Sequence, residues 1–257
     1  MIVCRSAAEL ELMRDAGRLV GEVLTELAAA VAPGVSTADL DALAEKRILA
    51  AGAAPAFKGY HGYPATICAS INEEVIHGIP SGRRVLQDGD IISIDVGAAL
   101  GGYFGDSAVT LPVGKVSEKA ATLLRVTEEA LYKAIECARP GNRVSDVGHA
   151  VQQHVEQHGF SVVREFVGHG IGEQMHEEPQ VPNYGEPGRG PRLSEGMVIA
   201  IEPMVNAGKA AVKVLADGWT AVTRDGSLSA HFEHTVAVTS GEPWILTARA
   251  VTVPVQK

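Results

Sequence analysis

The sequence repeats itself at a fixed offset of 107 residues, and this duplication constrains the fold more than any other feature. The matching pairs are Pro33 and Pro140, Gly34 and Gly141, Asp39 and Asp146, Gly52 and Gly159, Gly78 and Gly185, Pro80 and Pro187, Leu86 and Leu193, Gly89 and Gly196, Ile92 and Ile199, and Ile94 and Ile201. Common Gly and Pro residues can align by chance. An unbroken register over about 60 residues favours a true duplication.

Each half of the repeat predicts two helices followed by strands. A capping box at residues 6–9 opens a helix of about 25 residues, and a second helix runs from Ser36 or Thr37 to Gly52. Residues 88–112 predict two strands around a glycine turn, and the second half predicts helices over about 117–138 and 145–158. We expect an α/β fold of the α+β kind, a single domain over 1–257 with halves at about 6–115 and 116–240, strands inside and helices outside.

Composition narrows the function classes. The 257 residues are 46% hydrophobic and 21% charged, as in globular proteins with a substantial core. A net charge of −9 without a basic run argues against nucleic-acid binding. The first residues lack the apolar core of a signal peptide, and no stretch is apolar enough to cross a membrane, so we expect a cytoplasmic protein. The three cysteines form no CxxC pair, which argues against a disulfide framework or a cysteine zinc site. No exposed apolar stripe is evident in the sequence, which favours a monomer.

Two aspartates in the strands of residues 88–112 form the first candidate site. Asp95 and Asp106 lie equally far from the midpoint between Leu100 and Gly101, so a turn centred there would make them direct cross-strand partners on one face. Two carboxylates placed in this way repel each other, and burial increases the cost unless a cation is present. The alternative is a solvent-facing hairpin with two ordinary aspartates.

The second half favours the metal-site interpretation. Glu202 is the duplicate of Asp95 and lies in the apolar run MVIAIEP, Glu233 begins another apolar strand, and His169 lies between glycines in VGHGIG. Four carboxylates and one imidazole would balance two divalent ions about 3.5–4 Å apart, which suits hydrolysis. Such ligands suit Mn, Fe, Co or Zn without selecting one. No GxSxG or HExxH motif offers a competing mechanism.

The chain also resembles a known family. The strings YHGYPATICASINEEVIHGIP, SIDVGAALGGYFGDSAVT, GHGIGEQMHEEPQVPNYG, EGMVIAIEPM and SAHFEHTVAV are similar to those of type I methionine aminopeptidases, over almost the whole chain. The resemblance implies the pita-bread fold, an internally duplicated domain with two metals at its centre. It also implies removal of the initiator methionine from nascent chains when the second residue is small.

The resemblance assigns roles to single residues. It implies that the two divalent ions are held by Asp95, Asp106, His169, Glu202 and Glu233. Asp106 and Glu233 would bridge both ions, and Glu202 would act as general base for the attacking water. His77 would contact the scissile amide, and His176 would stabilise the oxyanion of the tetrahedral intermediate. Taken alone, each of these two histidines would more often be a surface loop residue, and the flanking motifs reverse that preference.

The resemblance also implies a methionine pocket. Its residues would be Tyr60, His61, Tyr63, Cys68 and Trp219, an aromatic and sulfur-containing wall suited to a thioether. Ordinary core packing is the alternative for these side chains. Phe57 stands where the family often has Cys, and Met175 where it often has Phe, which affects the shape of the pocket. A monovalent cation would lie near Asn72 and Ser229.

Two rival functions remain open at this stage. Xaa-Pro aminopeptidases and prolidases use a similar metal site, but they usually carry a large N-terminal domain for which this chain has no length. A metal-free binding module of the same fold would lack one or more ligands, and here all five are present. The 30 residues between Glu202 and Glu233 leave no room for the insertion of the type II enzymes. The family role also implies transient contact with the ribosome.

Overall fold

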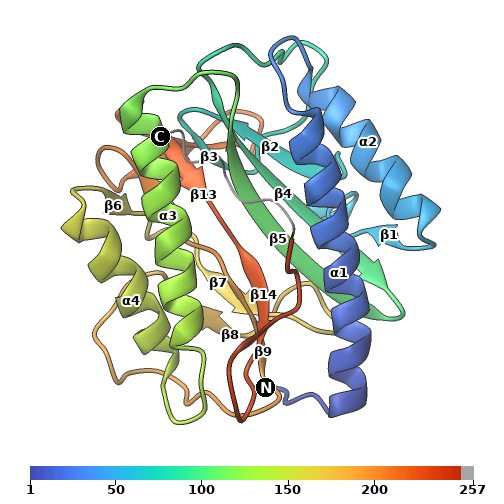
Figure 1. Cartoon of the computed structure of the whole chain (residues 1–257), viewed down its shortest axis with the longest axis vertical. Helices are drawn as coiled ribbons and strands as arrows, with labels where there is room; N and C mark the ends of the chain where they lie inside the picture. The colour runs from blue at the N-terminus through green and yellow to red at the C-terminus, as the bar shows by residue number, and fades with distance from the viewer. Residues whose placement is uncertain (250–257) are drawn as a thin grey trace.

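The computed structural model describes residues 1–249, so the last residues of the predicted domain, 250–257, lie outside the described residues. Two helix pairs flank a central region of strands (Figure 1). The first pair is α1 (Ala7–Ala30) and α2 (Thr37–Ala50), and the second is α3 (Glu118–Glu136) and α4 (Val144–Gln157). The bounds agree with the predicted helices to within a few residues.

Local capping explains where the helices of the first half begin. The Ser6 hydroxyl accepts a hydrogen bond from the backbone N–H of Glu9, and the Glu9 carboxylate accepts one from the backbone of Ser6. Ser36 and Asp39 form the same capping box at the start of α2. Each box satisfies two N–H groups that have no partner within the helix. The predicted starts of both helices are therefore confirmed.

The strands of the described residues form four sheets, and every strand pair is antiparallel. The first sheet contains β1 (Ala54–Pro55), β2 (Ile67–Ile71), β4 (Ile91–Leu100) and β5 (Tyr103–Pro112). Two three-stranded sheets contain β6 (Ser161–Val162), β10 (Met204–Asn206) and β13 (Ser229–His231), and β3 (Glu74–Ile76), β11 (Val212–Val214) and β12 (Ala221–Thr223). The fourth contains β7 (Gly168–Gly170), β8 (Glu177–Val181), β9 (Val198–Ile201), β14 (His234–Ala237) and β15 (Trp244–Ile245).

The offset of 107 residues is visible in the backbone. The bounds of α4 and β6 are those of α2 and β1 shifted by 107, as the residue numbers of the four elements show. An isolated β-bridge joins Ser36 to Val85, and a second one joins Arg143 to Arg192 at the same offset. In each half this bridge ties the start of the second helix to the segment that leads into the strands.

The register of the β4–β5 hairpin differs from the prediction. Leu100 pairs with Tyr103, so the turn consists of Gly101 and Gly102, which both have positive φ. Two residues with positive φ form the two-residue turn that matches the twist of a hairpin. The centre of the turn is therefore one residue later than predicted. The predicted direct pairing of Asp95 with Asp106 was wrong, because Asp95 pairs with Ala108 and Asp106 with Gly97.

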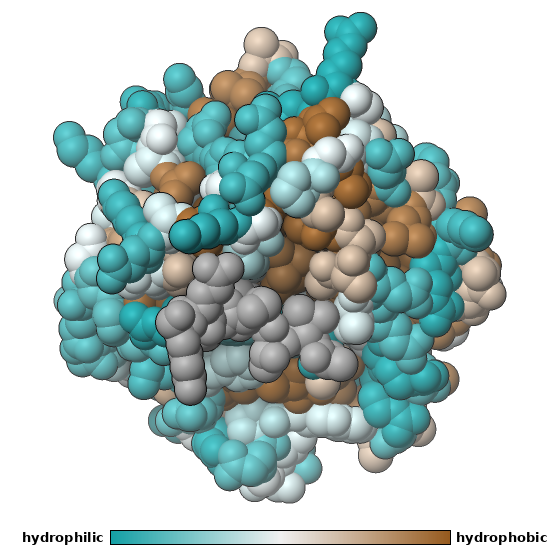
Figure 2. Space-filling model, turned by 45° about the horizontal axis from the view of Figure 1, so that its top comes forward, coloured by the Kyte–Doolittle hydropathy of each residue, from teal (hydrophilic) through white to brown (hydrophobic). Residues whose placement is uncertain are grey.

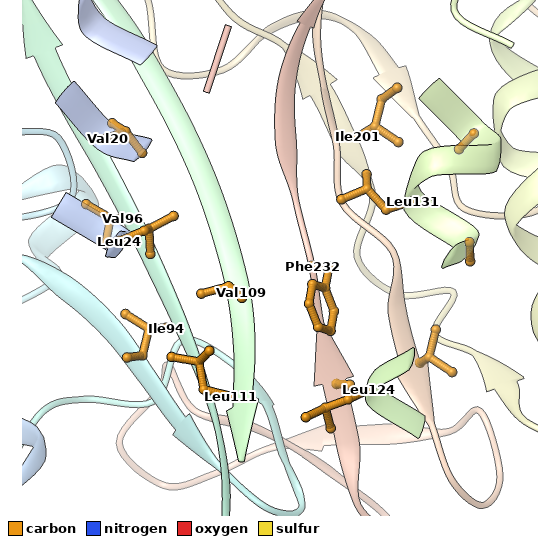
Figure 3. Close-up of a cluster of buried hydrophobic side chains, with 14 of the residues drawn as sticks. Val20, Leu24, Ile94, Val96, Val109, Leu111, Leu124, Leu131, Ile201 and Phe232 are labelled. Atoms are coloured by element: carbon orange, nitrogen blue, oxygen red, sulfur yellow. The ribbon is translucent and has the colours of Figure 1, made fainter. Parts of the chain in front are cut away.

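The two faces of this hairpin have different environments. Ile94 and Val96 of β4 and Val109 and Leu111 of β5 are buried and lie toward α1 (Figure 3). Successive side chains of a strand point to opposite faces, so the aspartates point away from α1. In the second half, Phe232 is fully buried and lies beside α3 in the same view. The aspartates therefore face the space between the two halves.

The surface agrees with a protein that buries its apolar residues. Hydrophilic residues cover most of the face in Figure 2, and apolar residues show mainly toward its upper centre. Among residues 1–249, no helix is both long enough and apolar enough to span a bilayer.

Candidate metal centre and substrate pocket

A cavity of about 240 Å³ lies between the two halves and collects all fourteen predicted site residues. Its lining residues are Phe57, Tyr60, His61, Tyr63, Cys68, His77, Asp95, Asp106, His169, Met175, His176, Glu202, Trp219 and Glu233. These residues come from segments spread over nearly the whole chain, so only the tertiary fold brings them together. The lining combines acidic groups with aromatic and sulfur-containing groups, and Cys68 pairs with Asp95 across β2 and β4.

The two aspartates reach the cavity from neighbouring strands. They lie diagonally across the β4–β5 ladder, and because the register differs from the prediction by two residues, they still share one face. The backbone of Asp106 is fixed from the second half. Its N–H donates to the Thr235 hydroxyl at 3.1 Å, and that hydroxyl donates to the Asp106 carbonyl at 2.8 Å. β14 thus holds β5 at the position of the carboxylate.

His169 lies on β7 between two glycines, and at both positions a larger residue would clash with neighbouring backbone. A Cβ at Gly168 would come 2.3 Å from the Ala200 carbonyl oxygen, and one at Gly170 would come 2.2 Å from that of Glu178. These glycines therefore allow the close backbone approach that the sequence predicted. The Nδ1–H of His169 donates to the Gly170 carbonyl at 2.9 Å. In the neutral ring this leaves the lone pair of Nε2 free for the site.

The two glutamates enter from the second half. Glu202 follows β9 directly, and its Oε1 lies 3.6 Å from the Nε2 of His169. Glu233 lies between β13 and β14, where its N–H donates to the Ala108 carbonyl at 2.9 Å. Its own carbonyl accepts from the Ser107 hydroxyl at 2.6 Å. These bonds attach the backbone of Glu233 to the strand that carries Asp106.

Burial makes this group of carboxylates hard to ionise. Burial raises the pKa of Asp95 to about 7. Burial, and then the neighbouring carboxylates, raise the pKa values of Asp106, Glu202 and Glu233 well above their usual range. Burial also lowers the pKa of His169 to about 4, so its imidazole is neutral at pH 7. The protein therefore presents acidic oxygens and a neutral nitrogen. The guanidinium of Arg249 donates to the Glu233 carbonyl at 3.3 Å, but its charge offsets only part of the rise in the pKa of Glu233.

These residues fit divalent metal ions. Within the described residues, Oδ1 of Asp95, Oδ1 of Asp106 and Oε1 of Glu233 are buried and have no hydrogen-bond partner. Ligand atoms of Asp106, His169 and Glu233 lie within 4.8 Å of one another. Buried carboxylate oxygens without partners are costly unless an ion or a proton compensates them. The orphaned atoms and the mixed oxygen and nitrogen donors are those expected of a transition-metal or zinc site.

Two histidines stand beside the acidic group. The ring of His176 lies with its centroid 4.3 Å from that of His169, and its Nδ1 is 2.8 Å from the Tyr60 hydroxyl. His77 has a positive φ of 60° and packs against Trp219. Burial lowers the pKa values of both histidines, that of His77 to about 4. Both are therefore neutral at pH 7 and able to donate one N–H each.

The remaining wall of the cavity is apolar. Phe57, Tyr63, Cys68 and Met175 form a buried cluster against which Trp219 packs. The Tyr63 hydroxyl donates to the carbonyl oxygens of Ile67 and Gly78, which fixes the ring. A straight thioether chain fits such a wall, because sulfur gains from contact with aromatic rings.

Sequence reasoning missed one histidine near the site. His231 is buried, its Nε2 lies 3.9 Å from Oε2 of Glu202, and this nitrogen has no hydrogen-bond partner among the described residues. The available signal was the spacing to Glu233, because the sequence predicts a strand there and residues two apart on a strand share a face. In the structure β13 ends at His231, and Glu233 lies just after it. The predicted monovalent-cation residues lie elsewhere, where the Ser229 N–H donates to the Asn72 carbonyl at 2.8 Å.

Comparison with known proteins agrees with these features. Residues 11–240 match metallopeptidase family M24. The chain is 58% identical over 247 residues to the methionine aminopeptidase of Clostridium acetobutylicum, covering 96% of this chain and 99% of that protein. It is also 58% identical over 239 residues to methionine aminopeptidase 1 of Bacillus subtilis, covering 93% of this chain and 96% of the relative.

Solved structures extend the comparison. A methionine aminopeptidase from Thermotoga maritima superposes with a TM-score of 0.95 at 48% identity, covering 97% of this chain and 100% of the other. A prolidase from Pyrococcus horikoshii has a TM-score of 0.80 at 24% identity, covering all of this chain and 66% of the other, which shows a common fold alone. The predicted α/β pita-bread fold with duplicated halves is confirmed. This chain belongs to metallopeptidase family M24.

Proposed function

We propose that this protein is a metal-dependent aminopeptidase that hydrolyses the N-terminal methionine of proteins and peptides when the second residue is small. One observation carries the proposal: a single cavity joins an acidic, partnerless set of metal-ligand atoms to an apolar wall of aromatic and sulfur-containing side chains. The names and the identity of the relatives give the substrate class.

In the proposal, two divalent ions would be held by Asp95, Asp106, His169, Glu202 and Glu233. Support comes from the buried oxygens without partners and from the closeness of Asp106, His169 and Glu233. When bound, divalent ions at this position polarise a carbonyl and lower the pKa of water. The choice among Co, Mn, Fe and Zn is left to the measurement below. A monovalent cation near Asn72 and Ser229 remains part of the proposal on the family resemblance alone.

The catalytic roles follow from position and protonation. Glu202 takes the proton of the attacking water and returns it to the leaving amine, and its Oε1 lies among the other proposed ligands, 3.6 Å from Nε2 of His169. His176 donates a hydrogen bond to the developing oxyanion, and the Tyr60 hydroxyl beside its Nδ1 orients the ring. His77 donates to the scissile amide. Both histidines act as neutral donors, because burial lowers their pKa values.

The substrate side chain occupies the apolar part of the cavity. In the proposal it lies among Tyr60, His61, Tyr63, Cys68 and Trp219, with Phe57 and Met175 closing the wall. The rings of Tyr63 and Trp219 pack edge to face, 5.1 Å apart between centroids, and form an aromatic surface with which a thioether makes favourable contact. A side chain bound there would place the scissile amide next to the carboxylates.

The cellular setting is part of the same proposal. We infer one catalytic domain over residues 1–257 with halves at about 6–115 and 116–240. It acts as a cytoplasmic monomer on the N-termini of nascent chains, with transient ribosome contact and without nucleic-acid or membrane binding of its own. The net charge of −9 and the hydrophilic residues over most of the face in Figure 2 support the absence of nucleic-acid and membrane binding.

The first experiment is methionine release from Met-Ala-Ser after chelation and dialysis, followed by separate addition of Mn, Co, Fe and Zn. We expect activity to vanish on chelation and to return with at least one metal. An Xaa-Pro peptide and a peptide that begins with Leu are assayed in parallel. Faster cleavage of the Xaa-Pro peptide would assign the protein to prolidase-like chemistry instead. Silence with every metal in folded protein would favour the metal-free binding module.

A further inference from the structure

A second cluster of metal-ligand groups lies on the outer helices, away from the cavity. Glu129 on α3 and His154 on α4 face each other, and His158 caps the end of α4. Ligand atoms of these three residues lie within 4.8 Å of one another, and none of the three lines the cavity. The two helices pack side by side (Figure 1). The two histidines are four residues apart, so their side chains lie on one face of α4.

The hydrogen bonds within the cluster pair one imidazole with the carboxylate and leave Nε2 of the other imidazole free. Nε2 of His154 lies 3.0 Å from Oε2 of Glu129, and the centroids of the two histidine rings are 4.6 Å apart. Nδ1–H of His158 donates to the His154 carbonyl at 2.8 Å. Because Nδ1 is the donor in this bond, Nε2 is the nitrogen of His158 that can offer a lone pair to a metal ion.

The first half holds an equivalent cluster that contains no histidine. There, Oε1 of Glu22 accepts from Arg18 at 3.0 Å, and Oε2 accepts from Arg47 on the neighbouring helix at 3.1 Å. The equivalents at an offset of 107 are Arg125, Glu129 and His154, with 2.8 Å and 3.0 Å for the same two contacts. The second half thus keeps the helix-to-helix contact but replaces a permanent cation with a metal-binding side chain.

A further difference between the halves favours a metal. The position equivalent to His158 is Ala51, so the second imidazole occurs only in the second half.

We propose that Glu129, His154 and His158 form a second divalent-metal site that links α3 to α4. Two imidazole nitrogens and one carboxylate suit Zn²⁺, with water completing a tetrahedral shell, and exclude strong binding of Mg²⁺ or Ca²⁺. The ion takes the place of the hydrogen between Nε2 of His154 and Glu129, and neutral His154 then carries its proton on Nδ1. The site is independent of the proposed aminopeptidase function.

The test is the amount of Zn²⁺ that the chelated, full-length protein binds in equilibrium dialysis at micromolar free Zn²⁺. The variants are His158→Ala, which removes an exposed ligand, and His154→Arg, which restores the contact found in the first half. Glu22→Gln is the matched control, because it disrupts the equivalent cluster that lacks histidine. The cavity takes up metal in every variant, so the readout is the difference in stoichiometry.

We expect the wild type and Glu22→Gln to bind one more Zn²⁺ per chain than His158→Ala or His154→Arg, with unchanged peptidase activity in all four. Imidazole NMR signals of His154 and His158 should shift on Zn²⁺ addition to the wild type. Equal stoichiometry in all four proteins, or unshifted signals, would overturn the proposal. Either result is obtained whether or not methionine is released, so the proposed function and this site fail separately.

Discussion

Replacing Asp106 with Asn should make the metal-free protein more stable while abolishing activity. The substitution keeps the shape of the side chain and removes one charge from the buried acidic group. The Asn amide can also donate to Oε1 of Glu233, which has no partner among the described residues. Loss of a bridging ligand should prevent metal-dependent hydrolysis, with methionine release falling to background.

The size of the stability gain follows from the spacing of the carboxylates. Ligand atoms of Asp106 and Glu233 lie within 4.8 Å of each other. Two unit charges at such a separation repel by about 3 kcal/mol at an effective dielectric constant of about 20. At pH 8 the folded wild type either bears this repulsion or takes up a proton that the unfolded chain does not bind, and both cost stability. The Asn variant avoids both costs.

The assay is urea unfolding in EDTA at pH 8 and at pH 4. We expect the free energy of unfolding at pH 8 to rise by up to about 3 kcal/mol, and the gain to shrink at pH 4, where both carboxyls are protonated. Glu186→Gln, which removes an exposed carboxylate, is the control and should change little. A metal-free Asp106→Asn protein that is less stable than the wild type at pH 8 would refute the repulsion argument. Full activity of the variant would refute the metal site itself.

Four further predictions follow from the structure. Burial raises the pKa of Asp95 in the folded protein to about 7, so the folded metal-free protein binds more protons than the unfolded chain between about pH 4 and pH 7. Its free energy of unfolding should therefore fall as pH rises through this window. This trend should weaken when metal is bound. Phe232→Ala should cost about 3–5 kcal/mol in urea unfolding, since the ring is fully buried, and a cost under about 1 kcal/mol would contradict the packing seen here. Gly105→Ala should lower the free energy of unfolding in urea by about 1–3 kcal/mol, because the added Cβ would lie 2.9 Å from the backbone of Gly17 in α1. His176→Gln should lower kcat about 10²–10³-fold with a small change in KM, and a change in KM alone would assign it to binding rather than to the oxyanion.

The helices and the duplication could be predicted because their signals are local. The capping boxes at Ser6 and Ser36 and the Pro-Gly breaks each act within a few residues, and the structure confirms the helix starts. The carboxylates could be identified as unusual because each lies in an apolar run, where an isolated charge is costly. That signal needs no knowledge of which strands pair.

The geometry of the site could not be predicted in the same way. The register of the β4–β5 hairpin depends on whether the turn uses Leu100 and Gly101 or Gly101 and Gly102, and the positive φ of both glycines decides it. The predicted pairing of the two aspartates was wrong, but the prediction that they share one face was correct, because a shift of two residues keeps both side chains on the same face. The position of His231 beside Glu202 likewise depends on how the loops between strands run.

The sequence by itself determined two related halves, their helices and the residue types available for metal chemistry. Only the tertiary structure decided that groups from both halves meet in one cavity. It also decided that Glu129 and His154 join the helices of the second half at the position where Glu22 and Arg47 join those of the first. The physical reason is the range of the forces. Helix capping and turn conformation act over a few residues, whereas burial, repulsion between carboxylates and ligand geometry depend on residues that only folding brings together.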